Sequence, residues 1–409
     1  MEKQTLWTKN FCLLTFASIL GAVGGIAGGY AMGFLVYDET GSTLATGLLV
    51  AIRVIPQFLL PILIAPWMDR LPRKPFLVYG DFLAGILYAL CGLYLRKYPF
   101  SYIGYLVFSL VLSSIGAMDS LAYSSIYPQV IPKGFEEKGY SFSGMLYPVM
   151  SVLIMPAAAL LMDTIGTANV LLIQSVLSIV AAILENAISI APDKQETRKI
   201  QTVSQWYHDL LDGFRYIKGE RGLLSIYAYM AVTNGAATGY GPVLTAFFRT
   251  APGYTAMMYS LFSVAEFTGR TLGGIIHYHV KIPEKKRFGF AFVVYQVYEW
   301  LDAILLWIPY PLMLVNRGIC GFLGINSATL REVAVQRYIP DEYRARVNAF
   351  QEATINAARS ILAVAVGSLG EVLGNRGALT VTALFCILFC WLTIWRNRAE
   401  VNKVYEATK

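Results

Sequence analysis

A group of ionisable residues lies inside long apolar stretches of this sequence. These residues are Arg53, Asp119, Glu185, Glu266, Arg270, Glu299, Asp302, Arg317, Glu352 and Arg359. Charged groups at membrane depth are rare and by default mark a functional site. An acid in an apolar cavity can take up and release a proton near neutral pH, and an arginine there can bind an anionic or acceptor-rich ligand. The residue types therefore indicate reversible binding of protons and of a ligand within a membrane.

The composition shows that the apolar stretches must face lipid. Of 409 residues, 56% are hydrophobic and only 14% are charged, and the mean hydropathy is +0.53. A soluble domain carries roughly 25% charged residues, so this chain cannot cover its surface with polar side chains. The net charge of +7 does not indicate nucleic acid as a partner, because the basic residues lie in connections between apolar stretches. The expected partner is a lipid bilayer.

Apolar stretches of about 20 residues, the length that a membrane-spanning helix needs, divide the chain into two similar halves. They cover residues 11–37, 43–68, 75–95, 100–122, 140–162, 167–190, 223–248, 255–279, 288–308, 310–330, 347–371 and 377–395. Such long apolar runs favour helices over barrel strands, which would alternate polar and apolar residues. We therefore expect an all-α membrane protein, with twelve transmembrane helices in two pseudo-symmetric six-helix halves, residues 1–190 and 223–409.

The linker at residues 191–222 and the other connections set the expected orientation. In the linker, Trp206, Leu210, Phe214 and Ile217 repeat on one helical face, which predicts an amphipathic helix on the membrane surface. Basic residues collect on the cytoplasmic side of membrane proteins. Here the connections on one side carry nearly all of them, and the other side holds only Arg96, Lys97, Arg249 and Arg376. Both termini and the linker are therefore expected in the cytoplasm.

The short turn between the second and third spans carries a family resemblance. Its "MDRLPRK" resembles the D-R-x-G-R-K core of the signature loop of the major facilitator superfamily, with Pro72 in place of the usual glycine and Ala65 in place of an opening glycine. The stretches "ETGSTLATGLLVAIRVIPQFL", "SSIYPQVIP", "LLDGFRYIKGERGL" and "QRYIPDEYRARVNAF" are similar to the macrolide-efflux and enterobactin-exporter branch. The resemblance covers essentially the whole chain in order.

The resemblance implies a gating latch on the cytoplasmic side. Asp69 would pair with Arg344 or Arg346 at the start of span eleven when the cavity opens outward, and Arg73 would face Asp81 in span three. The residues of this expected latch are Asp69, Arg70, Arg73, Lys74, Asp81, Arg344 and Arg346. The alternative is a loop that only retains positive charge inside. A degenerate repeat, "GGIIHYHVKIPEKKRFG", follows span eight in the second half.

The resemblance also sorts the intramembrane charges. In the family fold, spans three, six, nine and twelve are peripheral, so Glu185, Glu299 and Asp302 are expected near an interface or against a neighbouring span. The expected substrate or proton cavity contains Arg53, Asp119, Glu266, Arg270, Arg317, Glu352 and Arg359.

Two roles are expected among these cavity residues. Asp119 or Glu266 is the candidate site of ion coupling, although Glu266 stands four residues before Arg270 and the two can neutralise each other. Arg53, with Arg317 and Arg359 of the second half, indicates a substrate with an anionic or acceptor-rich part. Structural ion pairing is the alternative for the arginines.

Small residues in spans one and five predict close helix packing. Gly21, Gly25, Gly29 and Gly33 recur every fourth residue, a spacing that lets two helices approach in lipid. In span five, "IMPAAALLMD" with Pro156 occupies the place of the antiporter signature of exporter branches, but its glycines are absent.

Enzyme activity is not expected. "VYD" and "VYGD" contain the aspartates that intramembrane proteases use, but the topology puts Asp38 and Asp81 at opposite faces of the bilayer. His277 and His279 have no further ligand alongside, so neither a metal nor another cofactor is expected. The sequence contains no phosphate-binding glycine loop followed by lysine, so ATP is not expected as the driving force.

Taken together, sequence and resemblance predict a monomeric, multi-pass transporter of the bacterial cytoplasmic membrane. It would work by alternating access and export an amphipathic small molecule, such as a macrolide-like drug or a siderophore, against protons or sodium. Such an antiporter would contribute to multidrug resistance. An importer or a lysolipid flippase on the same scaffold, and a membrane receptor that transports nothing, remain the alternatives.

Overall fold

The computed structural model describes residues 5–68, 72–189, 203–279 and 282–407, and every regular element in these ranges is helical. The α-helices are α1 Lys9–Thr40, α2 Thr43–Met68, α3 Arg73–Lys97, α4 Tyr102–Val130, α5 Glu136–Ile165, α6 Thr167–Asn186, α7 Val203–Gly219, α8 Arg221–Thr250, α9 Ala256–His279, α10 Glu284–Ile304, α11 Tyr310–Tyr338, α12 Asp341–Cys390 and α13 Arg398–Glu406. Two short segments, η1 Leu305–Trp307 and η2 Trp391–Trp395, extend α10 and α12.

The helices provide twelve membrane spans. Among the described residues, α1 to α6, α10 and α12 are long and apolar enough to cross a bilayer. The helix α12 contains two spans, because its backbone turns at Gly374, whose φ of 70° lies in the left-handed region that favours glycine. The helices α8, α9 and α11 have spanning length but carry more polar residues, such as Asn234 and Asn326. The expected all-α fold with twelve transmembrane helices is confirmed.

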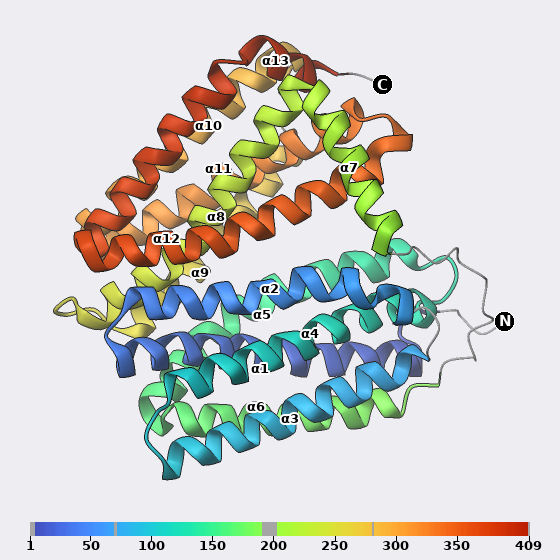
Figure 1. Ribbon diagram of the computed structural model, residues 1–409, viewed down its shortest axis with the longest axis vertical. Coiled ribbons are helices and arrows are strands. Elements are labelled where there is room, and N and C mark those ends of the chain that lie inside the picture. The colour runs from blue at the N-terminus through green and yellow to red at the C-terminus, as the bar shows by residue number, and fades with distance from the viewer. Residues whose placement is uncertain (1–4, 69–71, 190–202, 280–281, 408–409) are drawn as a thin grey trace. The chain divides into compact units, whose positions relative to one another are not determined.

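The chain forms two compact units, and in the first of them α1, α3, α4 and α6 run alongside one another (Figure 1). Unit 1 contains Met1–Thr40 and Ile52–Val203, and unit 2 contains Gly41–Ala51 and Ser204–Lys409. Within unit 1, α6 packs against α1 and α3, and α4 packs against α3. Within unit 2, α8 packs against α12, and α9 packs against α11.

The first turns of α2 pack against α12 in unit 2. Thr43 Oγ1 donates a hydrogen bond to the Gly367 carbonyl at 2.7 Å. The Glu371 carboxylate accepts from Ser42 Oγ at 2.6 Å and from the Leu44 backbone N–H at 3.1 Å. A carboxylate at this position satisfies free N–H groups and complements the positive end of the helix dipole. These bonds join the start of α2 to the end of the first span of α12.

The close contact of α1 with its neighbour lies on a different face from the expected one. A Cβ added at Gly24 would lie 1.9 Å from Gln174 Oε1 of α6, and one at Gly28 would meet the same side chain at 3.7 Å. The expected packing stripe was Gly21, Gly25, Gly29 and Gly33. Three of these glycines have no described atom within 4 Å of an added Cβ, and Gly29 faces Arg53 instead. The stripe lies on another face than Gly24, because a shift of one residue rotates a helix face by about 100°. The packing role expected for the stripe stays a prediction.

The helix α5 contains Pro148 and Pro156 and continues through both of them. Each proline removes one backbone hydrogen bond from the helix. The packing role expected for Pro156 stays a prediction.

The linker helix α7 contacts the start of α12. Phe214 lies 5.4 Å from Phe350 between ring centroids, and Tyr216 stacks on Tyr343 at 4.7 Å. Ile217 is fully buried. The side chains of Trp206 and Leu210 lie outside the described residues. The apolar face of α7 therefore packs at least in part on protein, where the sequence predicted a membrane surface.

Candidate functional site

The loop part of the expected latch lies largely outside the described residues. Asp69 and Arg70 belong to the undescribed segment, so their pairing stays a prediction. Arg73 begins α3, after the N-cap residue Pro72. Lys74 Nζ donates a hydrogen bond to the Asn186 carbonyl at the end of α6, at 2.6 Å. Lys74 thus joins two helix ends of unit 1.

The two arginines expected on the other side of the latch lie at the start of α12. Arg344 Nη2 donates to the backbone carbonyls of Gln336 at 3.1 Å and Ile339 at 3.4 Å, at the end of α11. Arg346 Nη1 lies 3.7 Å from Asp212 Oδ2 of α7. Both arginines therefore take part in contacts that hold the α11–α12 turn and α7 together within unit 2.

Three carboxylic acids from three helices of unit 1 come together. They are Asp81 of α3, Asp119 of α4 and Glu185 of α6, and they lie close enough to repel one another electrostatically. Glu185 is only 4% exposed, and its Oε2 has no hydrogen-bond partner among the described residues. Asp119 Oδ1 is also buried, and it too has no hydrogen-bond partner there. We call these three residues the acidic cluster.

The acidic cluster combines residues that the sequence had separated. Asp81 was expected in the latch, Asp119 in the cavity, and Glu185 near an interface or against a neighbouring span. Glu185 is buried on α6, which packs against α3. One signal in the sequence could have found the cluster: all three acids lie within a few residues of the same predicted membrane face.

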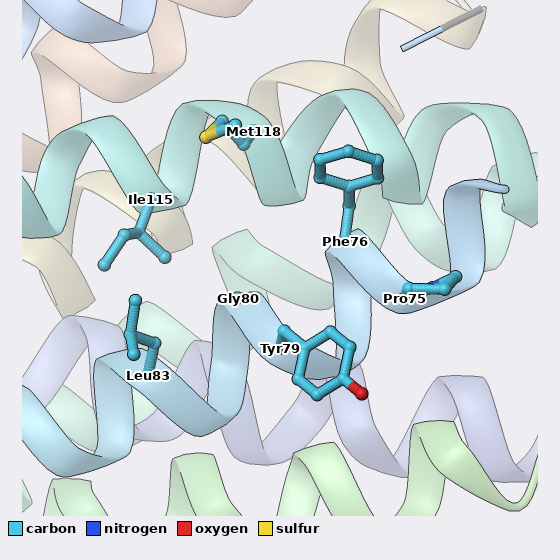
Figure 2. Close-up of a pocket in the computed structure, with 7 residues that line it drawn as sticks. All are labelled: Pro75, Phe76, Tyr79, Gly80, Leu83, Ile115 and Met118. Atoms are coloured by element: carbon cyan, nitrogen blue, oxygen red, sulfur yellow. The ribbon is translucent and has the colours of Figure 1, made fainter. Parts of the chain in front are cut away.

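A groove lies between α3 and α4, next to the helix segments that carry Asp81 and Asp119 (Figure 2). Its volume is about 280 Å³, and it is lined by Pro75, Phe76, Tyr79, Gly80, Leu83, Ile115 and Met118. A Cβ added at Gly80 would lie 3.5 Å from Asp119 Oδ1. Gly80 therefore both lines the groove and lies next to the Asp119 carboxylate.

Arg53 of α2 lies in unit 1 against α1. Its Nη2 is 3.6 Å from the position that a Cβ would take at Gly29. Tyr88 of α3 and Tyr105 of α4, both nearly fully buried, lie within the electrostatic range of its charge. Arg53 thus lies where four helices of unit 1 approach one another.

The buried charges of α10 and α11 form an ion pair in unit 2. Arg317 and Asp302 are hydrogen-bonded and ion-paired, and they are 8% and 3% exposed. Arg317 Nη2 also donates to Asn316 Oδ1 at 2.8 Å. Glu299 is 5% exposed on the same helix as Asp302. Arg317 was expected as a cavity residue, but its charge is neutralised in the interior of the bundle. Glu299 and Asp302 pack against neighbouring spans, which is one of the two positions expected for them.

The remaining expected cavity residues are more exposed. Arg270 Nη2 lies 2.8 Å from Glu266 Oε1, which confirms the pairing that their spacing indicated. Arg359 Nη1 donates to Asn356 Oδ1 at 3.4 Å, and Glu352 is exposed on α12. None of these residues joins the acidic cluster of unit 1.

His277 does not belong to a metal site in the part of the chain that the structure describes. Its Nδ1 lies 3.0 Å from Asn326 Oδ1 of α11. No group of three or more potential ligands lies close enough to hold a metal ion among these residues. The histidine instead links α9 to α11.

Comparisons with known proteins are consistent with this architecture. Residues 12–297 match the sequence profile of the Major Facilitator Superfamily. The chain is 22% identical over 423 residues to the uncharacterized MFS-type transporter YvqJ of Bacillus subtilis strain 168, covering 100% of this chain and 98% of that protein.

Solved structures share the fold at low identity. A bacterial homologue of the human lysosomal transporter Spinster, in an inward-facing and unoccupied conformation, matches with a TM-score of 0.69 and 13% identity, over 97% of this chain and 96% of that one. The nucleoside transporter NupG matches with a TM-score of 0.67 and 12% identity, over 95% of this chain and 99% of that one.

Proposed function

Because this chain belongs to the major facilitator superfamily, a group of membrane transporters, we propose that it exports an amphipathic small molecule in exchange for protons. Transport would proceed by alternating access, in a bacterial cytoplasmic membrane with both termini inside. The chain would act as a carrier and catalyse no reaction. The branch-specific stretches near Arg53 and Arg344 support the outward direction and a macrolide-like or siderophore-like substrate.

The acidic cluster supports proton coupling. Three acids share one region of unit 1, and none of them is ion-paired with a described basic residue. Like charges that share a buried site cannot all ionise easily, so such a group holds at least one proton. A site of this kind can load and release a proton when its access to water changes. The orphaned oxygens of Asp119 and Glu185 are the single observation that carries this proposal.

Asp119 is the better of the two candidate coupling residues. Glu266 is already ion-paired with Arg270 on the same helix, and both side chains are partly exposed. Glu266 therefore already has a counter-charge, whereas Asp119 has no such partner among the described residues.

Transport by reconstituted protein tests this function. Purified protein in liposomes is given radiolabelled erythromycin, 2,3-dihydroxybenzoylserine and lysophosphatidylcholine, with and without an imposed pH gradient. We expect one probe to accumulate only with the gradient, and Asp119→Asn to abolish this drive while the exchange of labelled for unlabelled probe persists. Glu266→Gln, the matched control, should keep most of the drive.

Other outcomes of the same measurement would decide against the proposal. Full pH-driven accumulation by Asp119→Asn and by Glu185→Gln would remove the acidic cluster from coupling. Accumulation with the opposite gradient would identify an importer. Binding of a probe without any flux would indicate a receptor.

A further inference from the structure

We propose that Arg53 binds the negatively charged group of the transported molecule, a carboxylate or phosphate attached to an apolar body. This role rests on the transport function proposed above and adds the class of substrate. It favours an acidic, siderophore-like molecule over a macrolide, whose amine is basic.

Arg53 lies well within the length of α2, next to a face of α1 that carries glycines. It follows the start of α2 by ten residues, which is about 15 Å along a helix. Its Nη2 and Nη1 lie 3.6 and 3.8 Å from the Cβ position of Gly29. One turn away on either side, Gly25 and Gly33 have no described atom within 4 Å of an added Cβ. The face of α1 next to the guanidinium therefore leaves room for a ligand.

Arg53 differs from the other arginines at this depth because no described residue forms a hydrogen bond or ion pair with it. Arg317 and Arg270 each contact a carboxylate. Arg359 contacts the amide oxygens of Asn356 and of Asn234 on α8. An isolated guanidinium within a bilayer is costly, and such groups are found paired or next to a water-filled cavity. The counter-charge of Arg53 is missing from the described protein, and a bound anion would supply it.

Two buried hydroxyl groups without partners lie on the neighbouring helix α4. Tyr105, which lies in the electrostatic field of Arg53, is 4% exposed, and its hydroxyl has no hydrogen-bond partner among the described residues. Ser109, one turn further along the same helix, is 0% exposed, and its Oγ is equally unpartnered in that part of the chain. A guanidinium together with free hydroxyl donors suits a group with several acceptor oxygens.

Aromatic rings next to these donors provide a surface for the apolar part of the ligand. Phe108 packs against Tyr88 with ring centroids 5.8 Å apart and against Tyr105 at 5.7 Å. Clustered rings bury large apolar areas while the tyrosine hydroxyls stay available for polar contacts. The proposed site therefore combines the charge of Arg53 with hydroxyl groups of α4 and a group of aromatic rings.

The proposed anion site is separate from the acidic cluster. Tyr88, near Arg53, and Asp81 of the cluster are seven residues apart on α3, which is about 10 Å along the helix. No ion pair joins Arg53 to Asp81 among the described residues. The two sites can therefore be changed by separate substitutions.

A pair of fluorescent probes tests the proposal on the full-length protein. Dansyl-glycine carries a carboxylate, and dansylamide has the same aromatic body without the charge. Binding is measured by fluorescence titration in dodecyl maltoside. We expect Arg53→Gln to weaken dansyl-glycine binding at least about tenfold, because a charge-assisted hydrogen bond is lost, and to leave dansylamide binding unchanged. Arg53→Lys should weaken dansyl-glycine binding less than Arg53→Gln does.

Two further variants control for folding and for net charge. Gly29→Leu keeps the arginine but fills the space beside it, and it should also weaken dansyl-glycine binding at least about tenfold. Arg376→Gln removes an arginine that lies over Phe247 and Trp307, and it should leave both affinities unchanged. The proposal is overturned if the wild type binds the two probes equally or binds neither. It is also overturned if Gly29→Leu and a folded Arg53→Gln both bind dansyl-glycine like the wild type.

Vesicles distinguish a soluble anion from a lipid headgroup. If phosphatidylglycerol vesicles suppress dansyl-glycine binding in the wild type and phosphatidylcholine vesicles do not, the anion site binds lipid phosphate. If neither suppresses it, the site binds a soluble anion. The binding titration needs no pH gradient, so a loss of pH-driven transport alone leaves the anion site standing. Normal dansyl-glycine binding by both Gly29→Leu and Arg53→Gln overturns the anion site and leaves proton coupling untouched.

Discussion

The two units differ in whether their buried charges form ion pairs. In unit 2, the buried Arg317 is paired with the buried Asp302, and the more exposed Arg270 is paired with Glu266. In unit 1, Arg53 and the acids of the acidic cluster have no ion-pair partner among the described residues. A paired buried charge resists change, because removing either partner leaves the other uncompensated. An unpaired one is available to a proton or a ligand. We therefore propose a scaffolding role for the Asp302–Arg317 pair of unit 2 and a binding role for Arg53 and the acidic cluster of unit 1.

The largest expected effect concerns the ion pair of unit 2. Asp302→Asn leaves Arg317 buried without a counter-charge, and we expect a loss of about 3–5 kcal/mol in the free energy of unfolding. Denaturation of the purified protein in detergent measures this loss. The double variant Asp302→Asn with Arg317→Gln should recover much of it. A stable single variant would contradict the scaffolding role.

Substitutions that neutralise the acids of unit 1 should not lower the stability of the protein. Neutralising Asp119 or Glu185 removes like-charge repulsion, so the stability of Asp119→Asn and Glu185→Gln is expected to be equal or higher, within about 1 kcal/mol of the wild type. Their pH-driven transport should nevertheless be lost. Denaturation and liposome flux, measured on the same preparations, check both parts. A large loss of stability would instead give these acids a structural role.

The packing of α1 on α6 provides a third test, of intermediate size. Gly24→Ala places a Cβ against the amide end of the buried Gln174 side chain, which must leave its present rotamer, at an expected cost of about 1 kcal/mol. Gly21→Ala meets no described atom within 4 Å and should change the stability by less than about 0.5 kcal/mol. Equal effects of the two substitutions would show that the contact face of α1 has been assigned incorrectly.

The smallest effect is expected at the exposed pair of unit 2. Glu266→Gln breaks an i, i+4 pair whose side chains are 32% and 50% exposed. Such pairs contribute about 0.2–0.5 kcal/mol and are weakened by screening. Thermal denaturation at low and high salt should therefore show a small difference that salt removes. A loss larger than that of Asp302→Asn would reverse the ranking of the two pairs.

The sequence predicted the fold better than the site because spans are local features. The apolar stretch at 75–95 became α3, Arg73–Lys97, and the stretch at 167–190 became α6, Thr167–Asn186. The Glu266–Arg270 pair was also predictable, because both residues lie on one helix at a spacing that brings them together.

Contacts between helices were not predictable in the same way. The pair Asp302–Arg317 joins α10 to α11, and the acidic cluster joins three helices. Such contacts depend on the rotation of each helix about its own axis, which apolar length does not specify. The glycines of α1 show the same limit, since the contacting face contains Gly24 and the regular stripe beginning at Gly21 does not. The latch and the branch assignment stay predictions.

The helix α2 has one further consequence for the molecule as a machine. Its first turns belong to unit 2 through Glu371, and from Ile52 onward it belongs to unit 1. It is therefore one continuous helix that belongs in part to each unit. Any movement of one unit relative to the other must bend α2 near residue 52 or break its hydrogen bonds with Glu371.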